Sequence, residues 1–484
     1  MNIIKKDIFS SRWAFIIAAL GMAIGAGNIW RFPRLAGQYG GSFIIPWIIF
    51  LFCWSIPLII IEFSIGKKYQ LGVIGSFTKA LGSKFNWMGY FICFCTMGIM
   101  FYYTVVCGWS LKYFIMSLTD GFFLLDHKSF WKYYTTGNME PVIYSIIAVC
   151  VGTLTLYFGI RNGIERVTKI LIPCLFILLV IASIKAITLP NSGEGLKYFF
   201  RIRIEDLMNY KVWLEALTQS AWSTGAGWGL ILTYATYVNR KETIFSNAIL
   251  TGVGNNLASI LAGLAVIPTV FALSPSLETA HSALNSGNQG LTFIFIPQLF
   301  SRMVAGSFFS SLFFLALFIA AVSSLIAMLE LTVRILIDFG LKRKKAVMLA
   351  GICAVIFAFP SAISINFFNN QDWVWGIGLI LSGFFFVLFV LKNGIFNFRQ
   401  NFLEYEGDNF ILKVTALKFI AVFLVVEFIL MFLWWFSQSL GWTGKNWWYP
   451  FGQSTIGTCL FQWCFVFLTG LILSKNISNK LKIN

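Results

Sequence analysis

The sequence predicts an all-α membrane protein with twelve transmembrane helices. Of its 484 residues, 58% are hydrophobic and only 11% are charged, whereas a soluble fold of this size carries about 25% charged residues. Because one membrane span needs about 20 apolar residues, the hydrophobic content is sufficient for twelve spans with some residues left for loops. This composition argues against a water-soluble enzyme and against a fibrous or disordered chain.

Apolar runs separated by polar or charged segments mark the expected spans. They cover residues 12–34, 42–66, 86–115, 141–158, 165–189, 213–237, 243–272, 304–338, 344–364, 372–392, 414–438 and 455–474. Between the seventh and eighth spans, residues 291–300 form an apolar run that is too short to cross a bilayer, which predicts a re-entrant or surface helix. No soluble domain is visible, so residues 1–484 are expected to form a single membrane domain.

The distribution of charge indicates a membrane partner and not a nucleic acid. The net charge is +17, but the basic residues are scattered over short loops without a basic stripe or a recognition motif. If the N-terminus lies inside, 24 of the 36 lysines and arginines fall on cytoplasmic segments. This bias predicts a multi-pass protein of the plasma membrane with both termini in the cytoplasm. A monomer and a homodimer both remain open.

Residues for catalysis or for a transition metal are missing from the pattern. All nine cysteines fall within apolar stretches, which predicts buried thiols and not a disulfide framework. The two histidines, His127 and His281, stand alone in expected loops. We therefore expect neither a zinc site nor an enzyme.

Two of the spans contain unusual glycine clusters. The first carries GMAIGAGNIWRFP at residues 21–33, and the sixth carries QSAWSTGAGWG at residues 219–229. Glycine weakens a helix by about 1 kcal/mol relative to alanine, and the neighbouring Ser, Thr and Asn side chains offer the backbone other partners. Small residues could instead serve close helix packing. The alternative is that both helices unwind near the midplane, where free carbonyls would bind cations.

The two clusters lie five spans apart, at matching places in two sets of five. This spacing predicts a first repeat over 12–189 and a second over 213–392, with the last two helices, 414–474, outside the repeats. An odd number of spans per repeat inverts the second copy, which is typical of secondary transporters.

Several motifs carry a specific resemblance. The blocks are GMAIGAGNIWRFP, GGSFIIPW, FYYTVVCGW, GIERVTKILIP, QSAWSTGAGWGLILTYATYV and AAVSSLIAMLE, in this order along the chain. They resemble the neurotransmitter:sodium symporter family, and within it the bacterial amino-acid carriers. The resemblance implies a 5+5 inverted-repeat fold of the leucine-transporter type with unwound helices 1 and 6. It also implies a sodium-coupled symporter that imports a neutral, hydrophobic or aromatic amino acid by alternating access.

The resemblance implies two Na⁺ sites. The first would use Ala23 (carbonyl), Asn28, Ser223 and Asn255, completed by the substrate carboxylate. The second would use the carbonyls of Gly21, Ile24 and Ala320 and the hydroxyls of Ser323 and Ser324. Neutral oxygen ligands suit a hard cation, although the two serines could simply bond the preceding turn of their own helix.

The implied substrate is an amino acid and not an amine. Monoamine carriers that resemble this chain have an Asp where it has Gly25, so an α-carboxylate would supply the missing negative charge. Twelve residues are expected at the substrate: Met22, Ala23, Ala26, Gly27, Ile99, Tyr103, Trp222, Ser223, Gly225, Trp228, Ser324 and Met328. None is charged, and a charged substrate side chain would be buried there without a partner.

Further implied features are an anion site and two gates. A chloride site would involve Trp47, Gln219, Ser223, Asn255 and Ser259, and chloride dependence is left open. Arg31 and Asp372 resemble an outer ion-pair gate. Lys6 and Asp338 resemble an inner latch, with Phe9 and Tyr237 nearby.

Two acidic residues within spans, Glu62 and Glu330, resemble buried hydrogen-bonded struts, with a proton relay as the alternative. For the whole chain, an ion channel or a substrate-sensing receptor on the same scaffold is the competing interpretation.

Overall fold

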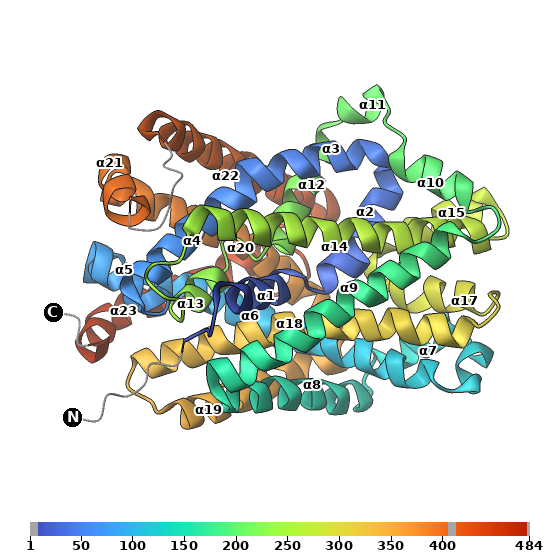
Figure 1. Cartoon of the computed structure of the whole chain (residues 1–484), viewed down its shortest axis with the longest axis horizontal. Coiled ribbons are helices and arrows are strands. Elements are labelled where there is room, and N and C mark those ends of the chain that lie inside the picture. The colour runs from blue at the N-terminus through green and yellow to red at the C-terminus, as the bar shows by residue number, and fades with distance from the viewer. Residues whose placement is uncertain (1–7, 405–412, 482–484) are drawn as a thin grey trace.

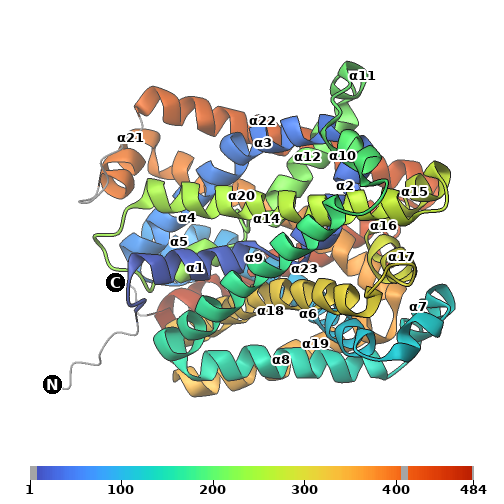
Figure 2. The ribbon, with the colours of Figure 1, turned by 45° about the vertical axis from the view of Figure 1, so that its right-hand side comes forward.

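The computed structural model describes residues 8–404 and 413–481 and shows a bundle of long helices (Figure 1). No β-strand occurs in these two ranges, apart from an isolated bridge between Thr136 and Ser364. In Figures 1 and 2, α1 (Arg12–Ala23), α6 (Asn86–Ser117) and α18 (Gly306–Asp338) lie together in the middle of the bundle. The predicted all-α membrane fold is confirmed.

Within the described ranges, ten helical stretches are long and apolar enough to cross a membrane. They are Gly41–Tyr69 (with α3, Gly41–Phe50, and α4, Ile56–Tyr69), Ser83–Ser117 (with α6), Glu140–Tyr157 (α8), Ile160–Ile187 (with α9, Arg166–Ile187), Ile244–Leu273 (α14), Gly306–Asp338 (α18), Arg343–Ile363 (α19), Ile365–Asn393 (α20), Val414–Asn446 (with α22, Val414–Thr443) and Ile456–Leu481 (α23). An eleventh is α1 together with Gly27–Tyr39, bent by 55°. The predicted sixth span consists of two short helices, α12 (Tyr210–Ser223) and α13 (Leu230–Ala235).

Helix α2 (Phe32–Tyr39) is the end of the bent first span. Short helices fill the connections between the spans: α5 (Val73–Leu81), α7 (His127–Tyr134), α10 (Ser192–Phe200), α11 (Ile204–Leu207), α15 (Leu277–Leu284), α16 (Gly287–Gln289), α17 (Ile296–Phe300) and α21 (Ile395–Phe398). The run 291–300 becomes a π-helical turn, Gly290–Phe295, followed by α17. Its Phe293 stacks on Trp131 of α7 at 4.7 Å, so this segment covers one end of the bundle and does not cross it.

The first span breaks because a side chain replaces a backbone partner. Ile24 leaves the helix with extended backbone angles (φ −76°, ψ 96°). The amide of Gly25 then donates to Asn28 Oδ1 at 2.9 Å instead of to a carbonyl one turn earlier. The chain resumes as a π-helical turn, Gly27–Arg31. The competition between Asn and the backbone therefore acts as expected.

The sixth span breaks at its glycines. Gly225, Gly227 and Gly229 all have positive φ, at +70°, +87° and +79°, a region that L side chains rarely adopt. A Cβ on Gly227 would also lie 2.9 Å from the Cα of Gly383 in α20. Close packing is therefore present, but it accompanies the unwinding that the sequence predicted. The assignment of 12–189 and 213–392 as repeats stays a prediction.

The described cysteines are all free thiols. The prediction that all nine are buried is wrong for Cys150 of α8 and Cys464 of α23, which are exposed. An apolar stretch in a membrane protein can face lipid as well as the protein interior, so hydropathy alone does not indicate burial. His127 lies on α7 and is buried, while His281 lies on α15 and is exposed.

Candidate functional site

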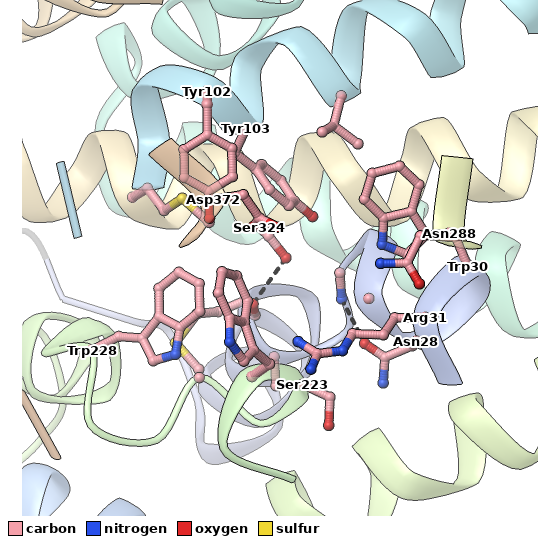
Figure 3. A pocket seen from close by; sticks show the side chains of 18 of the residues that line it. Asn28, Trp30, Arg31, Tyr102, Tyr103, Ser223, Trp228, Asn288, Ser324 and Asp372 are labelled. Atoms are coloured by element: carbon pink, nitrogen blue, oxygen red, sulfur yellow. Dashed lines mark hydrogen bonds between the residues drawn. The ribbon is translucent and has the colours of Figure 1, made fainter. Parts of the chain in front are cut away.

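A pocket lies between the breaks of the first and sixth spans (Figure 3). Ten of the twelve predicted substrate residues line it: Met22, Ala23, Gly27, Tyr103, Trp222, Ser223, Gly225, Trp228, Ser324 and Met328. The other two, Ala26 and Ile99, are fully buried but do not line the pocket in this conformation. Ala26 contributes through its backbone, because its amide donates to Tyr103 Oη at 2.8 Å.

The pocket also has walls that the sequence did not single out. These are Trp30, Tyr102, Val106, Leu230, Asn288, Gln289 and Phe368. Asn288 and Gln289 come from the short segment before residues 291–300, for which the sequence predicts only a re-entrant or surface helix. Their position depends on how that segment folds back over the bundle, and no local pattern encodes it.

A cluster of amides joins the first, sixth and seventh spans beneath the pocket. Asn28 Nδ2 donates to Asn255 Oδ1 and to Ser259 Oγ, both at 2.8 Å. The same end of the Asn255 amide lies 3.3 Å from the Ala23 carbonyl oxygen and 2.8 Å from the Ser223 carbonyl oxygen. All four residues predicted for the first sodium site therefore meet at one point.

Hydrogen bonds alone do not satisfy this cluster. In one orientation of the Asn255 amide, its oxygen faces two carbonyl oxygens, which repel it. If the amide is turned over, its nitrogen donates to both carbonyls but then faces the Asn28 nitrogen at 2.8 Å. Turning Asn28 as well would place its nitrogen against the Gly25 amide, which now donates to the Asn28 oxygen at 2.9 Å. In the orientation with the Asn255 oxygen toward the two carbonyl oxygens, three oxygens face one another, and a cation bound among them would remove their repulsion.

The serine pair of the eighth span behaves in two ways. Ser324 Oγ donates across to the Met22 carbonyl at 3.0 Å and lies 3.5 Å from the Ile24 carbonyl, at the break of the first span. Ser323 Oγ instead donates to the Ala320 carbonyl of its own helix at 3.0 Å. Gly21 occupies the last turn of α1, where its Cα faces Ile172. Of the predicted second set, Ile24 lies beside Ser324, while Ser323 and Ala320 bond to each other within α18.

The substrate side of the pocket is aromatic and narrow. The rings of Trp222 and Trp228 lie 5.4 Å apart at 86°. A Cβ built on Gly25 would lie 2.8 Å from Tyr103 Oη and 2.9 Å from Ser324 Oγ. The chain therefore has no room for an aspartate at Gly25 in this conformation.

The predicted outer ion pair is not formed in this conformation. Arg31 and Asp372 both line the pocket, but Arg31 Nη2 lies 3.8 Å from Glu215 Oε2, and its guanidinium lies 5.8 Å from the centre of the Trp222 ring. Asp372 lies on the opposite side, near Tyr102 (Figure 3). Glu215 offers the arginine a nearer carboxylate, one helical turn before Gln219, and no motif in the sequence singled it out.

At the inner end, Asp338 pairs with a residue of its own helix. Arg334 Nη2 donates to Asp338 at 2.7 Å, and the Gly72 amide donates to the same carboxylate at 2.6 Å. Phe9 donates its amide to the Tyr237 carbonyl at 3.0 Å, so these two predicted neighbours do meet. Lys6, the predicted partner of Asp338, lies outside the described residues.

Both acidic residues within the spans are hydrogen-bonded struts. Glu62 is fully buried and accepts from the amides of Gly227 and Leu232. Glu330 accepts from Tyr237 Oη at 2.6 Å and from both terminal nitrogens of Arg343. Each carboxylate ties the inner half of the sixth span, or the turn after it, to a neighbouring helix.

The residues of the predicted anion site include members of the amide cluster, and some of their polar atoms have no hydrogen-bond partner in the described chain. Gln219 Nε2 lies 3.3 Å from the Gly27 carbonyl, while Gln219 Oε1 and Trp47 Nε1 have no hydrogen-bond partner in the described chain. Ser259 Oγ accepts from Asn28. Among the described residues there is no group of three or more His, Cys, Asp or Glu side chains that could bind a metal.

Comparison with known proteins identifies the family of this chain. The sodium:neurotransmitter symporter family matches residues 6–136 and 125–479, nearly the full length of the chain. The chain belongs to this family. This chain is 34% identical over 361 residues to an uncharacterised sodium-dependent transporter of Methanocaldococcus jannaschii, with 72% of this chain and 73% of that protein covered.

Two further relatives support the assignment. A sodium-dependent serotonin transporter of Drosophila melanogaster is 27% identical over 444 residues, which cover 81% of this chain and 70% of that protein. The crystal structure of MhsT in complex with L-phenylalanine superposes with a TM-score of 0.77 at 26% identity, and the match covers 88% of this symporter and all of that chain. The predicted fold of the leucine-transporter type is confirmed, and the symporter is a sodium-dependent multi-pass membrane transporter.

Proposed function

We propose that the symporter imports a neutral, hydrophobic or aromatic amino acid together with Na⁺ by alternating access. The observation that carries this proposal is the amide cluster of Asn28 and Asn255. The carbonyl oxygens of Ala23 and Ser223 lie 3.3 Å and 2.8 Å from one end of the Asn255 amide, and the Asn28 side chain contacts the same end at 2.8 Å, directly beside an aromatic pocket. Na⁺ would bind to the oxygens of this cluster, and the carboxylate of an amino acid held in the aromatic pocket would lie next to the ion.

The uncharged lining supports a neutral substrate. The pocket carries charge only at Arg31 and Asp372, which belong to the proposed outer gate. A charged substrate side chain would lie among Trp222, Trp228 and Met328 without a partner, at a cost of several kcal/mol. The bound L-phenylalanine in MhsT is consistent with this choice.

We propose two Na⁺ sites, and both lie where the first span is broken. The first is the amide cluster, and the second surrounds Ser324. The Ser324 hydroxyl donates its proton to the Met22 carbonyl at 3.0 Å, which leaves its oxygen lone pairs free to bind the ion of the second site. Each charge that crosses the membrane contributes about 2.3 kcal/mol per 100 mV, so two ions would drive appreciable accumulation.

In the closed states of the transporter, the residues of each gate would form their predicted pair. On the outer side, Arg31 would exchange Glu215 for Asp372, which lies across the same pocket. On the inner side, Asp338 would exchange Arg334 for Lys6, with Phe9 and Tyr237 as the aromatic contact. Both termini are placed in the cytoplasm and the protein in the plasma membrane. The protein would act as a monomer or a homodimer.

Chloride dependence is a separate part of the proposal. Ser259 is neutral where a carboxylate would balance two Na⁺ ions, and Trp47 Nε1 is an unpaired donor in the same predicted set, within the described chain. Replacing chloride by gluconate is expected to lower uptake several-fold. Unchanged uptake would mean that the site does not use an anion.

A binding screen tests the proposal. Radiolabelled amino acids are added to the purified protein in NaCl and in choline chloride. Saturable binding of an apolar amino acid only in NaCl is expected, whereas equal binding in both salts would contradict sodium coupling. A substrate-sensing receptor would bind in the same way without flux, and a channel would conduct ions without saturable amino-acid binding.

A further inference from the structure

A second pocket lies at the end of the bundle where α1 begins and α23 ends. Helix α4 supplies Lys67, Lys68 and Tyr69 to it, and α5 supplies Lys79. Arg240, from the turn after α13, and Phe402, from the π-helical turn Arg399–Leu403, also line it. The cavity measures about 270 Å³ and is separate from the substrate pocket, with which it shares no lining residue.

The charged side chains among the described lining residues of this pocket are all positive. Four of these residues are lysine or arginine, and none of them is Asp or Glu. Like charges gathered around one cavity repel one another unless an anion lies between them. No salt bridge to Lys68, Lys79 or Arg240 occurs in the described part of the chain at 4.0 Å or less, although eight other pairs do.

The cationic side chains are held in place. Lys67 is only 3% exposed, and its Nζ donates to the carbonyl oxygen of Glu242 at 2.5 Å. Lys68 Nζ lies 3.9 Å from the centre of the Phe402 ring, and Lys79 Nζ lies 5.9 Å from the centre of the Tyr69 ring. Cation–π contacts and a buried hydrogen bond orient these amines before any ligand arrives.

We propose that this pocket binds the phosphate of an anionic membrane phospholipid. Phosphate is the anion that several convergent lysines and arginines recognise best. A lipid is favoured over free phosphate because the pocket lies at the end of span α4, at headgroup depth, and because Tyr69 and Phe402 provide an apolar wall. Basic pockets between membrane helices bind lipid headgroups in this way.

The bound phosphate would join parts of the transporter that are otherwise separate. It would contact α4, α5 and Arg240, which follows the inner half of the sixth span by only five residues. The pocket therefore links the lipid composition of one leaflet to the segment beside Tyr237. This inference does not depend on which amino acid the symporter carries.

The test compares two triple variants of the full-length protein in neutral detergent. The first, Lys68→Gln/Lys79→Gln/Arg240→Gln, removes three pocket charges. The matched control, Lys342→Gln/Lys344→Gln/Lys345→Gln, removes three charges at the N-terminal end of α19, which do not line the pocket. Native mass spectrometry measures binding of dihexanoyl phosphatidylglycerol, dihexanoyl phosphatidylcholine and inorganic phosphate, and thermal unfolding verifies that each variant is folded.

The wild type and the control are expected to bind phosphatidylglycerol at least about tenfold more tightly than phosphatidylcholine. The pocket variant is expected to lose about a hundredfold in phosphatidylglycerol affinity, because each of its three charges contributes about 1 kcal/mol near a membrane surface. Equal loss in the pocket variant and the control would overturn the site. Inorganic phosphate that binds as tightly as phosphatidylglycerol would overturn the lipid as its ligand. If the triple variant unfolds, Lys79→Gln alone, at an exposed position, must still weaken phosphatidylglycerol binding severalfold, and no change would contradict the proposal.

Discussion

Glu62 of α4 accepts a hydrogen bond from the amide of Gly227, at 2.6 Å, inside the break of the sixth span. Its second oxygen accepts from the amide of Leu232 at 3.2 Å, in the first turn of α13. The first amides of a helix have no partner within it, and they carry partial positive charge. One buried carboxylate thus satisfies backbone groups that the unwinding leaves exposed.

Replacing this carboxylate is expected to destabilise the break. Glu62→Gln would turn an NH₂ group toward one of the two amides, and a buried donor without an acceptor costs about 1–3 kcal/mol. We predict a lower midpoint of thermal unfolding and loss of most transport. Glu194→Gln, which removes an exposed carboxylate paired with Lys197, is the control. Equal midpoints for the two variants would contradict the role of Glu62.

The amide cluster is predicted to set the affinity for Na⁺. Asn28→Ala and Asn255→Ala each remove an oxygen from the proposed first site, so the Na⁺ concentration for half-maximal substrate binding should rise at least about tenfold, or about 1.4 kcal/mol. Asn86→Ala is the control, since this buried amide bonds to the Ser474 carbonyl far from the pocket. Sodium titrations that are unchanged in both site variants would exclude the assignment.

Space at Gly25 is predicted to be essential for binding. Gly25→Ala would place a Cβ within 2.9 Å of Tyr103 Oη and Ser324 Oγ, so the Tyr103 and Ser324 side chains must both move. Substrate affinity should fall at least about tenfold, within the cost of about 1–3 kcal/mol for overpacking. At Gly193 an added Cβ would have no atom within 4 Å. Gly193→Ala should therefore bind as the wild type does, and wild-type binding by Gly25→Ala would show that the space is not required.

The two carboxylates near Arg31, those of Asp372 and Glu215, are predicted to differ in their importance for transport. Asp372→Asn should slow uptake strongly while leaving equilibrium substrate binding nearly intact, because the Arg31 pair would form only on closing. Glu215→Gln removes a pair at 3.8 Å between partly exposed side chains, which contributes at most about 1 kcal/mol. The test measures uptake by both variants, and the larger defect is expected in Asp372→Asn. A larger defect in Glu215→Gln would contradict the assignment of Asp372 to the gate.

His127 is predicted to make stability depend on pH. Burial lowers the pKa of His127 from its ordinary 6.5 to about 4, and neither ring nitrogen has a hydrogen-bond partner in the described chain. Between pH 6.5 and pH 4 the unfolded chain binds a proton that the folded chain does not, so stability falls as the pH falls, by up to about 3 kcal/mol, and is constant above pH 6.5.

His127→Phe removes this titration and keeps an aromatic ring beside Phe122, which lies 4.8 Å away. The difference between thermal unfolding midpoints at pH 7 and pH 5 should shrink in this variant. His281→Phe should retain the wild-type difference, because His281 is exposed. An undiminished difference in His127→Phe would show that other groups cause the pH dependence.

Much of the fold follows from local sequence. Glycine readily adopts a left-handed backbone, and the glycines at Gly225–Gly229 mark the break of the sixth span. Asn28, which bonds to Gly25, marks the break of the first span. The ten predicted substrate residues that line the pocket all lie in or beside these motifs, or on the helices that the resemblance identifies. Glycine and asparagine act on their own backbone, so their effect can be predicted from neighbours in the sequence.

What could not be predicted depends on contacts between distant segments. Glu215 competes with Asp372 for Arg31, and Arg334 competes for Asp338; both choices depend on the conformation of the gates. Asn288 and Gln289 reach the pocket only because the segment before α17 folds back. The exposed Cys150 and Cys464 show the same limit, since an apolar run does not reveal whether it faces lipid or protein.

Uptake into proteoliposomes tests the sodium coupling most directly. Protein reconstituted at known density is given the radiolabelled amino acid that binds most tightly, with an inward Na⁺ gradient or with choline outside. We predict accumulation above the external concentration only with the Na⁺ gradient, and loss of that accumulation in Asn28→Ala. Equal uptake in choline, or sodium-dependent binding without any flux, would contradict sodium-coupled import.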